Sequence, residues 1–518
     1  MEPTLPRATS LPTGSWVSRA LRSFAPVKRD EALTVVLMSV NVFLLLTCYY
    51  VLKVVREPLI ADAHLFGFTG AELKSYSSAG QTLLLLAVVP AFGWLTNRVS
   101  RIRLMTTMQI IFMGCLGAFY LLDQAGAPIG LAFYLWVGVF NVLVISNFWS
   151  YANDVYTEEA GKRLFALIGV GGSLGAITGA FLPGILNNLV GTLGLMVIGV
   201  IALGCSMVLY QIVDRREEHR KAAVKQERAA KGADASAAKD KRGGFALVMR
   251  DRYLRLLALM LLVATIINTS GEYVIGEIAV RHSKEYAAQQ TGKTADAAPP
   301  TPSSGSAAVA KTEDPKTKAD ADNDAPETPA EKAAKDHYMK GFYSSYYGVV
   351  NLVSALLQLF AVTFLITKLG LRRALFIMPI IVLGGWVALL MFTNLATVRV
   401  EKTAENSLDY SLHNTLRQAL FLPTSAEAKY KAKAAIDTFF FRMGDVIAGL
   451  GIVFLIVRVL HLGAHTFAAM NIGLATLWLF LAARTGQLYT KLVAEHDKAN
   501  ASPPVAHTKH APHGLERD

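Results

Sequence analysis

Charged residues are scarce in this chain, and cysteines are scarcer still. Only 17% of its 518 residues are Asp, Glu, Lys or Arg, against about a quarter in ordinary soluble domains. The three cysteines, Cys48, Cys115 and Cys205, lie inside apolar runs, which excludes a disulfide framework of the small secreted type. With 53% hydrophobic residues, the chain is too apolar for a soluble protein of this length. It is therefore predicted to be a polytopic membrane protein.

The sequence lacks the motifs of nucleotide hydrolysis and dinucleotide binding. GVGGSLGAITG, from Gly169 to Gly179, contains a GxGxxG match, but it lies in a long apolar run without the βαβ unit that such a site needs. Its Gly171, Gly175 and Gly179 recur every four residues, which indicates close helix packing instead. We therefore predict no enzyme activity, no cofactor and no metal site, and any transport is expected to be secondary.

Apolar runs recur along the chain at about the 20-residue length that a bilayer span requires. Twelve such segments are predicted. The connections after the even-numbered segments are basic, whereas those between segments 3 and 4 and between segments 5 and 6 carry no Lys or Arg. This bias indicates that the basic loops and both termini are cytoplasmic. The loops also explain the net charge of +12, so no nucleic-acid partner is predicted.

The chain divides into two halves that resemble each other. The basic loop after segment 2 aligns with the loop after segment 8, so that Arg98 matches Lys368 and Arg103 matches Arg373. Two six-helix repeats in one orientation are typical of major facilitator transporters, and GWLTNRVSRIR resembles the loop signature of that superfamily. The predicted fold is all-α, with twelve transmembrane helices in a monomer. The expected divisions are a cytoplasmic leader at 1–30, an N-terminal half at 31–213, a cytoplasmic linker at 214–250, a C-terminal half at 251–490 with a disordered outer loop at 286–336, and a cytoplasmic tail at 491–518.

Charged side chains inside the apolar segments point to a transport pathway. Each costs about 2.5 to 3.5 kcal/mol at the centre of a span, so such residues usually face a water-filled cavity or one another. In LKVVREPLI, Lys53 and Arg56 share one helical face, and Glu57 adds a counter-charge. These residues are either cavity residues or anchors at the outer mouth. Glu272, deep in segment 7, has either a structural role or one in proton or substrate exchange.

Segment 10 contains ENSLDYSLHNTLRQALFLP, from Glu405 to Pro423, and is the most polar of the expected spans. Steps of four, three, four and four place one set of polar residues on a single helical stripe: Lys402, Asn406, Asp409, His413 and Arg417. Removing this helix from the membrane would put KYKAK outside, against the charge bias. The stripe is therefore predicted either to line a pathway or to hold helices together by ion pairs.

The segment from Asp409 resembles the ATP/ADP translocases of plastids and intracellular bacteria. The matching positions are Tyr410, Ser411, Leu412 and Pro423, and KAAID from Lys433 to Asp437. YYVLKVVREPLI is similar to a second family pattern, and FWSYANDVYTEEAGKR is similar to a third that includes Asn153. The chain differs from the translocases at Asp409, where they have Lys, and at Asn414, where they have Asp.

The resemblance implies a nucleotide transporter, an ATP:ADP antiporter of the bacterial inner membrane that binds a small anionic substrate. The residues expected to supply positive potential are Lys53, Arg56, Lys402, Arg417 and Arg442. The acids expected to pair with them in the empty carrier, or to carry a coupling proton, are Glu57, Glu272, Asp409 and Asp445. Asn153 and Asn406 complete the candidate substrate site. Two alternatives remain, a proton-coupled permease for another organic anion and a non-transporting receptor or scaffold.

Overall fold

The computed structural model describes residues 28, 31–63, 65, 67–96, 98–156, 158–218, 244–291, 327–425, 428 and 432–501. Among these residues the chain is almost entirely helical, and its only β contact is an isolated bridge between Leu65 and Phe68. The leader, most of the linker, the centre of the predicted outer loop and most of the tail lie outside the described residues.

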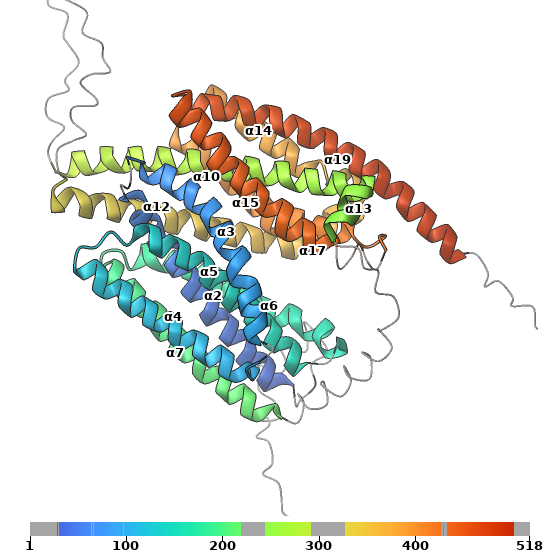
Figure 1. Ribbon diagram of the computed structural model, residues 1–518, viewed down its shortest axis with the longest axis horizontal. Coiled ribbons are helices and arrows are strands. Elements are labelled where there is room, and N and C mark those ends of the chain that lie inside the picture. The colour runs from blue at the N-terminus through green and yellow to red at the C-terminus, as the bar shows by residue number, and fades with distance from the viewer. Residues whose placement is uncertain are drawn as a thin grey trace, which may run out of the picture.

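The N-terminal half contains six long helices. They are α2 (Ala32–Ala61), α3 (Gly70–Thr96), α4 (Arg101–Gln124), α5 (Gly130–Val155), α6 (Glu158–Ile185) and α7 (Thr192–Arg216). Their apolar faces meet in one core that includes Phe133, Phe140 and Phe148. Figure 1 shows this half as a bundle coloured from blue to green.

The C-terminal half also crosses the bundle six times, but several crossings are broken into shorter elements. After the short α9 (Gly244–Arg250), the crossings are α10 (Arg252–Gln290); α12 (Pro329–Leu356) with η1 (Leu357–Ala361) and α13 (Val362–Ala374); α14 (Ile377–Met391); α15 (Leu395–Leu408) with η2 (Asp409–His413) and α16 (Asn414–Leu420); α17 (Lys433–Ala435) with η4 (Ile436–Phe440), α18 (Phe441–Val446), η5 (Ile447–Val453) and η6 (Leu455–Val459); and α19 (Ala464–Ala501). The η elements are π-helical turns.

The all-α polytopic fold is confirmed. Nine described helical runs are long and apolar enough to cross a membrane. The remaining crossings are α3, the 15-residue α14 and the polar run from α15 to α16. Both α10 and α12 extend into the segment at 286–336 that was expected to form a disordered outer loop. A capping box between Thr328 and Glu331 begins α12, since the side chain of each residue bonds to the backbone N–H of the other.

The glycine stripe of α6 packs closely against a neighbouring helix, as its spacing predicted, and that helix is α2. A Cβ atom at Gly171, Gly175 or Gly179 would overlap the backbone of α2 at Ser39, Phe43 and Thr47 respectively. The Thr47 hydroxyl donates a hydrogen bond to the carbonyl oxygen of Gly175 at 3.2 Å. Only glycine allows the two backbones to approach this closely.

The two ends of the bundle differ in how the halves meet. We call the end with Ala32 of α2 and Arg216 of α7 the terminal face, and the end with Ala61 of α2 and Ile185 of α6 the loop face. Toward the loop face, α12 packs along α6 and α2, and α3 packs along α10 and α18. Figure 1 shows α12 and α3 where the two bundles adjoin.

Candidate functional site

A cavity of about 310 Å³ lies between the halves. This volume is at the lower end of the range for small-molecule sites. Its walls come from α2, α3 and α5 of the first half and from α10, α12, α15, η2 and α18 of the second. Its charged lining residues are four bases and two acids: Lys53, Arg56, Lys74, Arg442, Glu272 and Asp445. Uncharged polar and aromatic side chains form most of the rest of the wall, among them Tyr49, Tyr134, Asn141, Asn268, Tyr347, Tyr410 and Phe441.

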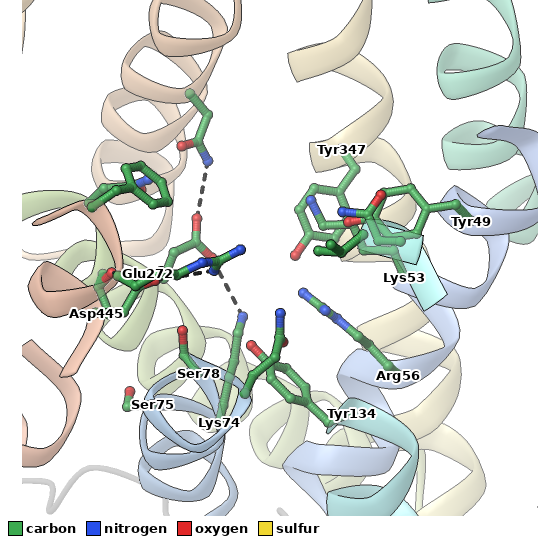
Figure 2. A pocket seen from close by; sticks show the side chains of 18 of the residues that line it. Tyr49, Lys53, Arg56, Lys74, Ser75, Ser78, Tyr134, Glu272, Tyr347 and Asp445 are labelled. Atoms are coloured by element: carbon green, nitrogen blue, oxygen red, sulfur yellow. Dashed lines mark hydrogen bonds and ion pairs between the residues drawn. The ribbon is translucent and has the colours of Figure 1, made fainter. Parts of the chain in front are cut away.

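The basic groups of the N-terminal half point into this space from two helices. Figure 2 shows Lys53 and Arg56 reaching inward from α2 and Lys74 reaching inward from α3. The Nζ atom of Lys53 lies 4.0 Å from the centre of the Tyr347 ring. The guanidinium carbon of Arg56 lies 4.4 Å from the centre of the Tyr134 ring. Aromatic faces therefore hold both cations in place without neutralising their charge.

Glu57 lies behind the cavity wall and binds three of its residues. Its carboxylate is 2.8 Å from Nζ of Lys74 and 3.2 Å from Nε of Arg56. The Tyr347 hydroxyl donates a hydrogen bond to it at 2.8 Å. Since Tyr347 belongs to the second half, Glu57 both orients two cations and joins the halves. With 1% of its surface exposed, it reaches the cavity through these partners.

Glu272 of α10 faces the cavity directly. Its carboxylate lies 3.6 Å from Nζ of Lys74, which forms an ion pair across the halves. It also accepts hydrogen bonds from Nδ2 of Asn406 at 3.1 Å and from the Tyr346 hydroxyl at 3.3 Å. Glu272 is therefore held in a fixed orientation against the cations of the first half (Figure 2).

The second acid of the lining, Asp445, carries a more local set of bonds. It accepts a hydrogen bond from the Thr269 hydroxyl at 2.7 Å and lies 3.5 Å from the guanidinium of Arg442. Both Arg442 and Asp445 belong to α18, so this pair belongs to the second half alone. It balances part of the charge on that side of the cavity.

Lys402 is fully buried behind Glu272 and does not line the cavity. Its Nζ atom lies 2.7 Å from Glu405 and 3.9 Å from Glu272. It also donates a hydrogen bond to Oδ1 of Asn268 at 2.7 Å. Lys402 thus links Glu272, which lines the cavity, to Glu405, a buried acid of α15.

Three of the predicted site residues lie away from this group. Asp409 is half-buried in η2 and does not line the cavity. Arg417 lies 3.8 Å from Asp437 and donates to the side chain of Asn414. Asn153 is exposed near the terminal end of α5. The cavity therefore gathers Lys53, Arg56, Glu272, Asn406, Arg442 and Asp445 from the predicted set, with Glu57 and Lys402 directly behind them.

The predicted polar stripe does not continue along the whole of segment 10. The π-helical turn η2 changes the rotation per residue between α15 and α16. At the last residue of this turn, His413 packs at right angles to Trp478 with ring centres 5.6 Å apart, away from the cavity. Asn406 and Tyr410 face the cavity instead. The single stripe was wrong because its spacing assumed a regular α-helix.

A second cavity of about 470 Å³ shares Tyr49, Lys53, Asn141 and Tyr410 with the first. Its other walls include Val42 of α2, which is nearer the start of α2 at the terminal face. The polar contacts between the halves lie toward the loop face, as with the guanidinium of Arg458, 2.6 Å from Glu72. The pathway therefore extends toward the terminal face and is closed at the loop face.

Sequence reasoning missed Lys74, whose ion pairs reach an acid in each half. The signal was present, because Lys74, Ser78 and Gln81 follow steps of four and three along one face of α3. It was overlooked because Lys74 stands at the beginning of an apolar segment, where a basic residue ordinarily marks the membrane surface.

Comparison with solved structures gives the same architecture. A mutant form of the nucleoside transporter NupG superposes with a TM-score of 0.53 at 13% identity, covering 87% of this chain and 99% of that chain. A POT family transporter in complex with 5-aminolevulinic acid also gives 0.53 at 13% identity, covering 88% and 96%. A peptide transporter POT in complex with alafosfalin gives 0.51 at 13% identity, covering 91% and 99%. No curated protein sequence matches the chain.

The family assignment rests on the sequence as well as on the shape. The model of the Major Facilitator Superfamily matches residues 17–291, more than half of the chain. This region contains the whole N-terminal half, the charged end of α2 and α10 with Glu272. Together with the two six-helix halves around a central cavity, the match shows that this chain is a multi-pass membrane transporter belonging to the Major Facilitator Superfamily.

Proposed function

We propose that this protein carries nucleotides, or closely related phosphorylated anions, across a bacterial inner membrane, by exchange of the ATP-for-ADP type. The observation that supports this most strongly is the convergence of Lys53, Arg56 and Lys74 in a cavity that also presents aromatic rings. The likeness of the segment around Tyr410 to the ATP/ADP translocases points to the same substrate class.

The basic side chains suit phosphate oxygens. Arg56 offers a planar fork that can bind two oxygens at once, and Lys53 and Lys74 add point charges beside it. Lys74 and Arg56 both pair with Glu57. A bound polyphosphate would compete with Glu57 for these two cations.

The aromatic rings suit the base of a nucleotide. Tyr49 and Tyr410 line both cavities at their junction. Stacking on such rings is tolerant of the identity of the base. We place the phosphates at the Lys74 end of the cavity and the base at the Tyr410 end.

The same contacts connect binding to alternating access. The Lys74–Glu272 pair and the Tyr347–Glu57 hydrogen bond join the halves on the loop-face side. A phosphate that competes for Lys74 weakens this closure, which allows the halves to rock open at the loop face. The basic loops favour a cytoplasmic location for the terminal face, and we therefore propose that the cavity opens to the cytoplasm.

Exchange by purified protein in liposomes tests this function. Uptake of labelled ATP is measured with ADP inside, with no internal nucleotide and with internal inorganic phosphate only. We expect rapid uptake only with internal ADP, and loss of most of that uptake in Arg56→Gln and Lys53→Gln. Arg281→Gln, an exposed position on α10, is the control and keeps normal uptake. Absence of ATP and ADP movement under all three conditions would overturn the nucleotide proposal.

A further inference from the structure

Glu401 of α15 is buried behind the cavity without a donor for its charge. Only 5% of its surface is exposed, and within the described part of the chain neither carboxylate oxygen receives a hydrogen bond. Its side chain lies on the same face of α15 as that of Glu405, one helical turn further along. One oxygen of Glu405 also lacks a donor. Two buried carboxyl groups therefore lie together with only one adjacent cation, Lys402.

Neighbouring helices leave space for this arrangement at two glycines. A Cβ atom at Gly385 of α14 would lie 2.3 Å from Cγ of Glu401. A Cβ atom at Gly271 of α10 would lie 3.0 Å from Cδ of Lys402 and 3.1 Å from its Nζ. A larger residue at either position would press on a charged side chain. The packing thus accommodates Glu401 and Lys402 specifically.

The charges of the group do not balance without a proton. Lys402 lies 2.7 Å from Glu405 and neutralises one carboxylate. A second negative charge on Glu401 would remain unpaired in a medium of low dielectric constant, which is strongly unfavourable. Two neighbouring carboxyl groups relieve this cost by sharing one proton. One bound proton makes the group of Glu401, Glu405 and Lys402 neutral.

We propose that Glu401 and Glu405 form a proton-binding site, and that Lys402 transmits its charge state to Glu272 in the cavity. Four other charged or titratable groups surround the pair. Lys402 lies on the same helix, Asp409 lies one turn beyond Glu405 in η2, Glu272 lies on α10 and Tyr346 lies on α12. The sequence of α14 contains no titratable side chain. The transport consequence rests on the proposed function, but proton binding itself does not.

Lys402 connects the proton-binding pair to Glu272 because it lies within reach of both Glu405 and Glu272. With one proton shared by the pair, Lys402 stays at Glu405, 3.9 Å from Glu272. Transfer of a second proton from cavity water to Glu405 removes that negative charge, and Lys402 then pairs with Glu272 instead. Glu272 in turn loosens its hold on Lys74, 3.6 Å away. Return of this proton to cavity water restores the original pairing, so a proton taken up at one face and released at the other would drive transport.

Infrared difference spectroscopy of the purified protein in lipid tests proton binding without any substrate. We expect a carboxylic acid C=O band at neutral pH that shifts in D2O, disappears in Glu401→Gln and fades as wild-type protein is made alkaline. Glu285→Gln, an exposed acid near the end of α10, is the matched control and leaves the band unchanged. A band that is the same in Glu401→Gln and in wild type overturns the proposal. Should Glu401→Gln fold poorly, Glu405→Gln and the alkaline titration of wild type replace it as tests. Loss of the band in both supports the proposal, and a band that persists in both overturns it.

Transport measurements separate the proton site from the proposed function. ATP–ADP exchange at equal pH on both sides reports nucleotide binding alone, and an added pH gradient reports coupling. We expect the gradient to accelerate wild-type uptake several-fold and to have no effect on Glu401→Gln, while exchange at equal pH remains. No exchange in wild type, with the infrared band still lost in Glu401→Gln, would overturn only the nucleotide assignment. A gradient response that Glu401→Gln retains would overturn the coupling role.

Discussion

The Nζ atom of Lys74 in α3 lies 3.6 Å from the carboxylate of Glu272 in α10, so an ion pair joins the two halves at the cavity. Lys74 also pairs with Glu57 at 2.8 Å and is only 6% exposed. Closure at the loop face and the charge of the cavity therefore depend on the same side chain. This relationship makes Lys74 the first target for mutation.

Lys74→Gln is expected to loosen closure at the loop face. A cysteine introduced at Ser78, which lines the cavity one turn below Lys74, reports this change in a background whose three native cysteines are alanine. We expect a membrane-impermeant thiol reagent added to intact cells to label Ser78→Cys several-fold faster when Lys74→Gln is also present. Lys332→Gln, at an exposed position of α12, is the control. Equal labelling rates with and without Lys74→Gln would contradict the role of this ion pair.

A second contact between the halves joins Arg458 of η6 to Glu72 of α3. The guanidinium lies 2.6 and 2.9 Å from the two carboxylate oxygens, while Glu72 is 1% exposed. Arg458→Ala leaves this buried carboxylate with only its bonds to Thr69. We expect a loss of about 1–3 kcal/mol of stability. The thermal unfolding midpoint in detergent measures it.

The double variant Arg458→Ala with Glu72→Ala provides the comparison for that measurement. It removes both charges, so no buried carboxylate is left without its partner. We expect its unfolding midpoint to lie between those of wild type and Arg458→Ala. A double variant that is less stable than Arg458→Ala would show that the two residues act separately.

Two glycine-to-alanine substitutions in α6 should change the stability of the protein in opposite directions. Gly175→Ala would drive a Cβ into the backbone of α2 at Phe43, and we expect a loss of about 1–3 kcal/mol from overpacking. Gly169→Ala on the same helix has no neighbour within 4 Å. There the better helix propensity of alanine should add up to about 1 kcal/mol. Unfolding midpoints that shift in the same direction would contradict the assigned packing.

Much of the fold was predictable from the sequence because burial in a membrane constrains each segment separately. Apolar runs of spanning length, basic loops and the repeated pattern from Arg98 and from Lys368 predicted two six-helix halves. The Gly171–Gly179 stripe predicted a close helix contact, though not that α2 was the partner. Partner identity depends on the tertiary arrangement, which no single segment encodes.

The candidate site was less predictable, for reasons visible in particular residues. Lys53, Arg56 and Glu272 stood out because each is charged within an apolar run. Lys74 and Glu401 stand near segment ends, where charge is common, and their burial follows only from the helices packed around them. His413 was placed on the cavity side because the π-helical turn η2 leaves no clear mark in the residue spacing.

Tyr410 offers a test of where the base of a nucleotide would lie. Its side chain lines both cavities, and 43% of its surface remains exposed, so a ring face is available for stacking. Stacking of a base on an aromatic ring contributes about 1–3 kcal/mol. Tyr410→Leu should therefore weaken ATP binding by roughly 5- to 150-fold, as measured by titration calorimetry of the purified protein.

Two comparisons make the Tyr410 result specific. Tyr410→Phe keeps the ring and should bind ATP nearly as wild type does, because stacking needs the π face rather than the hydroxyl. Inorganic pyrophosphate has no base, so its affinity should be the same for wild type and Tyr410→Leu. If Tyr410→Leu weakened ATP and pyrophosphate equally, the tyrosine would act on the shape of the cavity, and the base would have to bind elsewhere. An effect on ATP alone would place the base at the junction of the two cavities, with its phosphates directed toward Arg56 and Lys74.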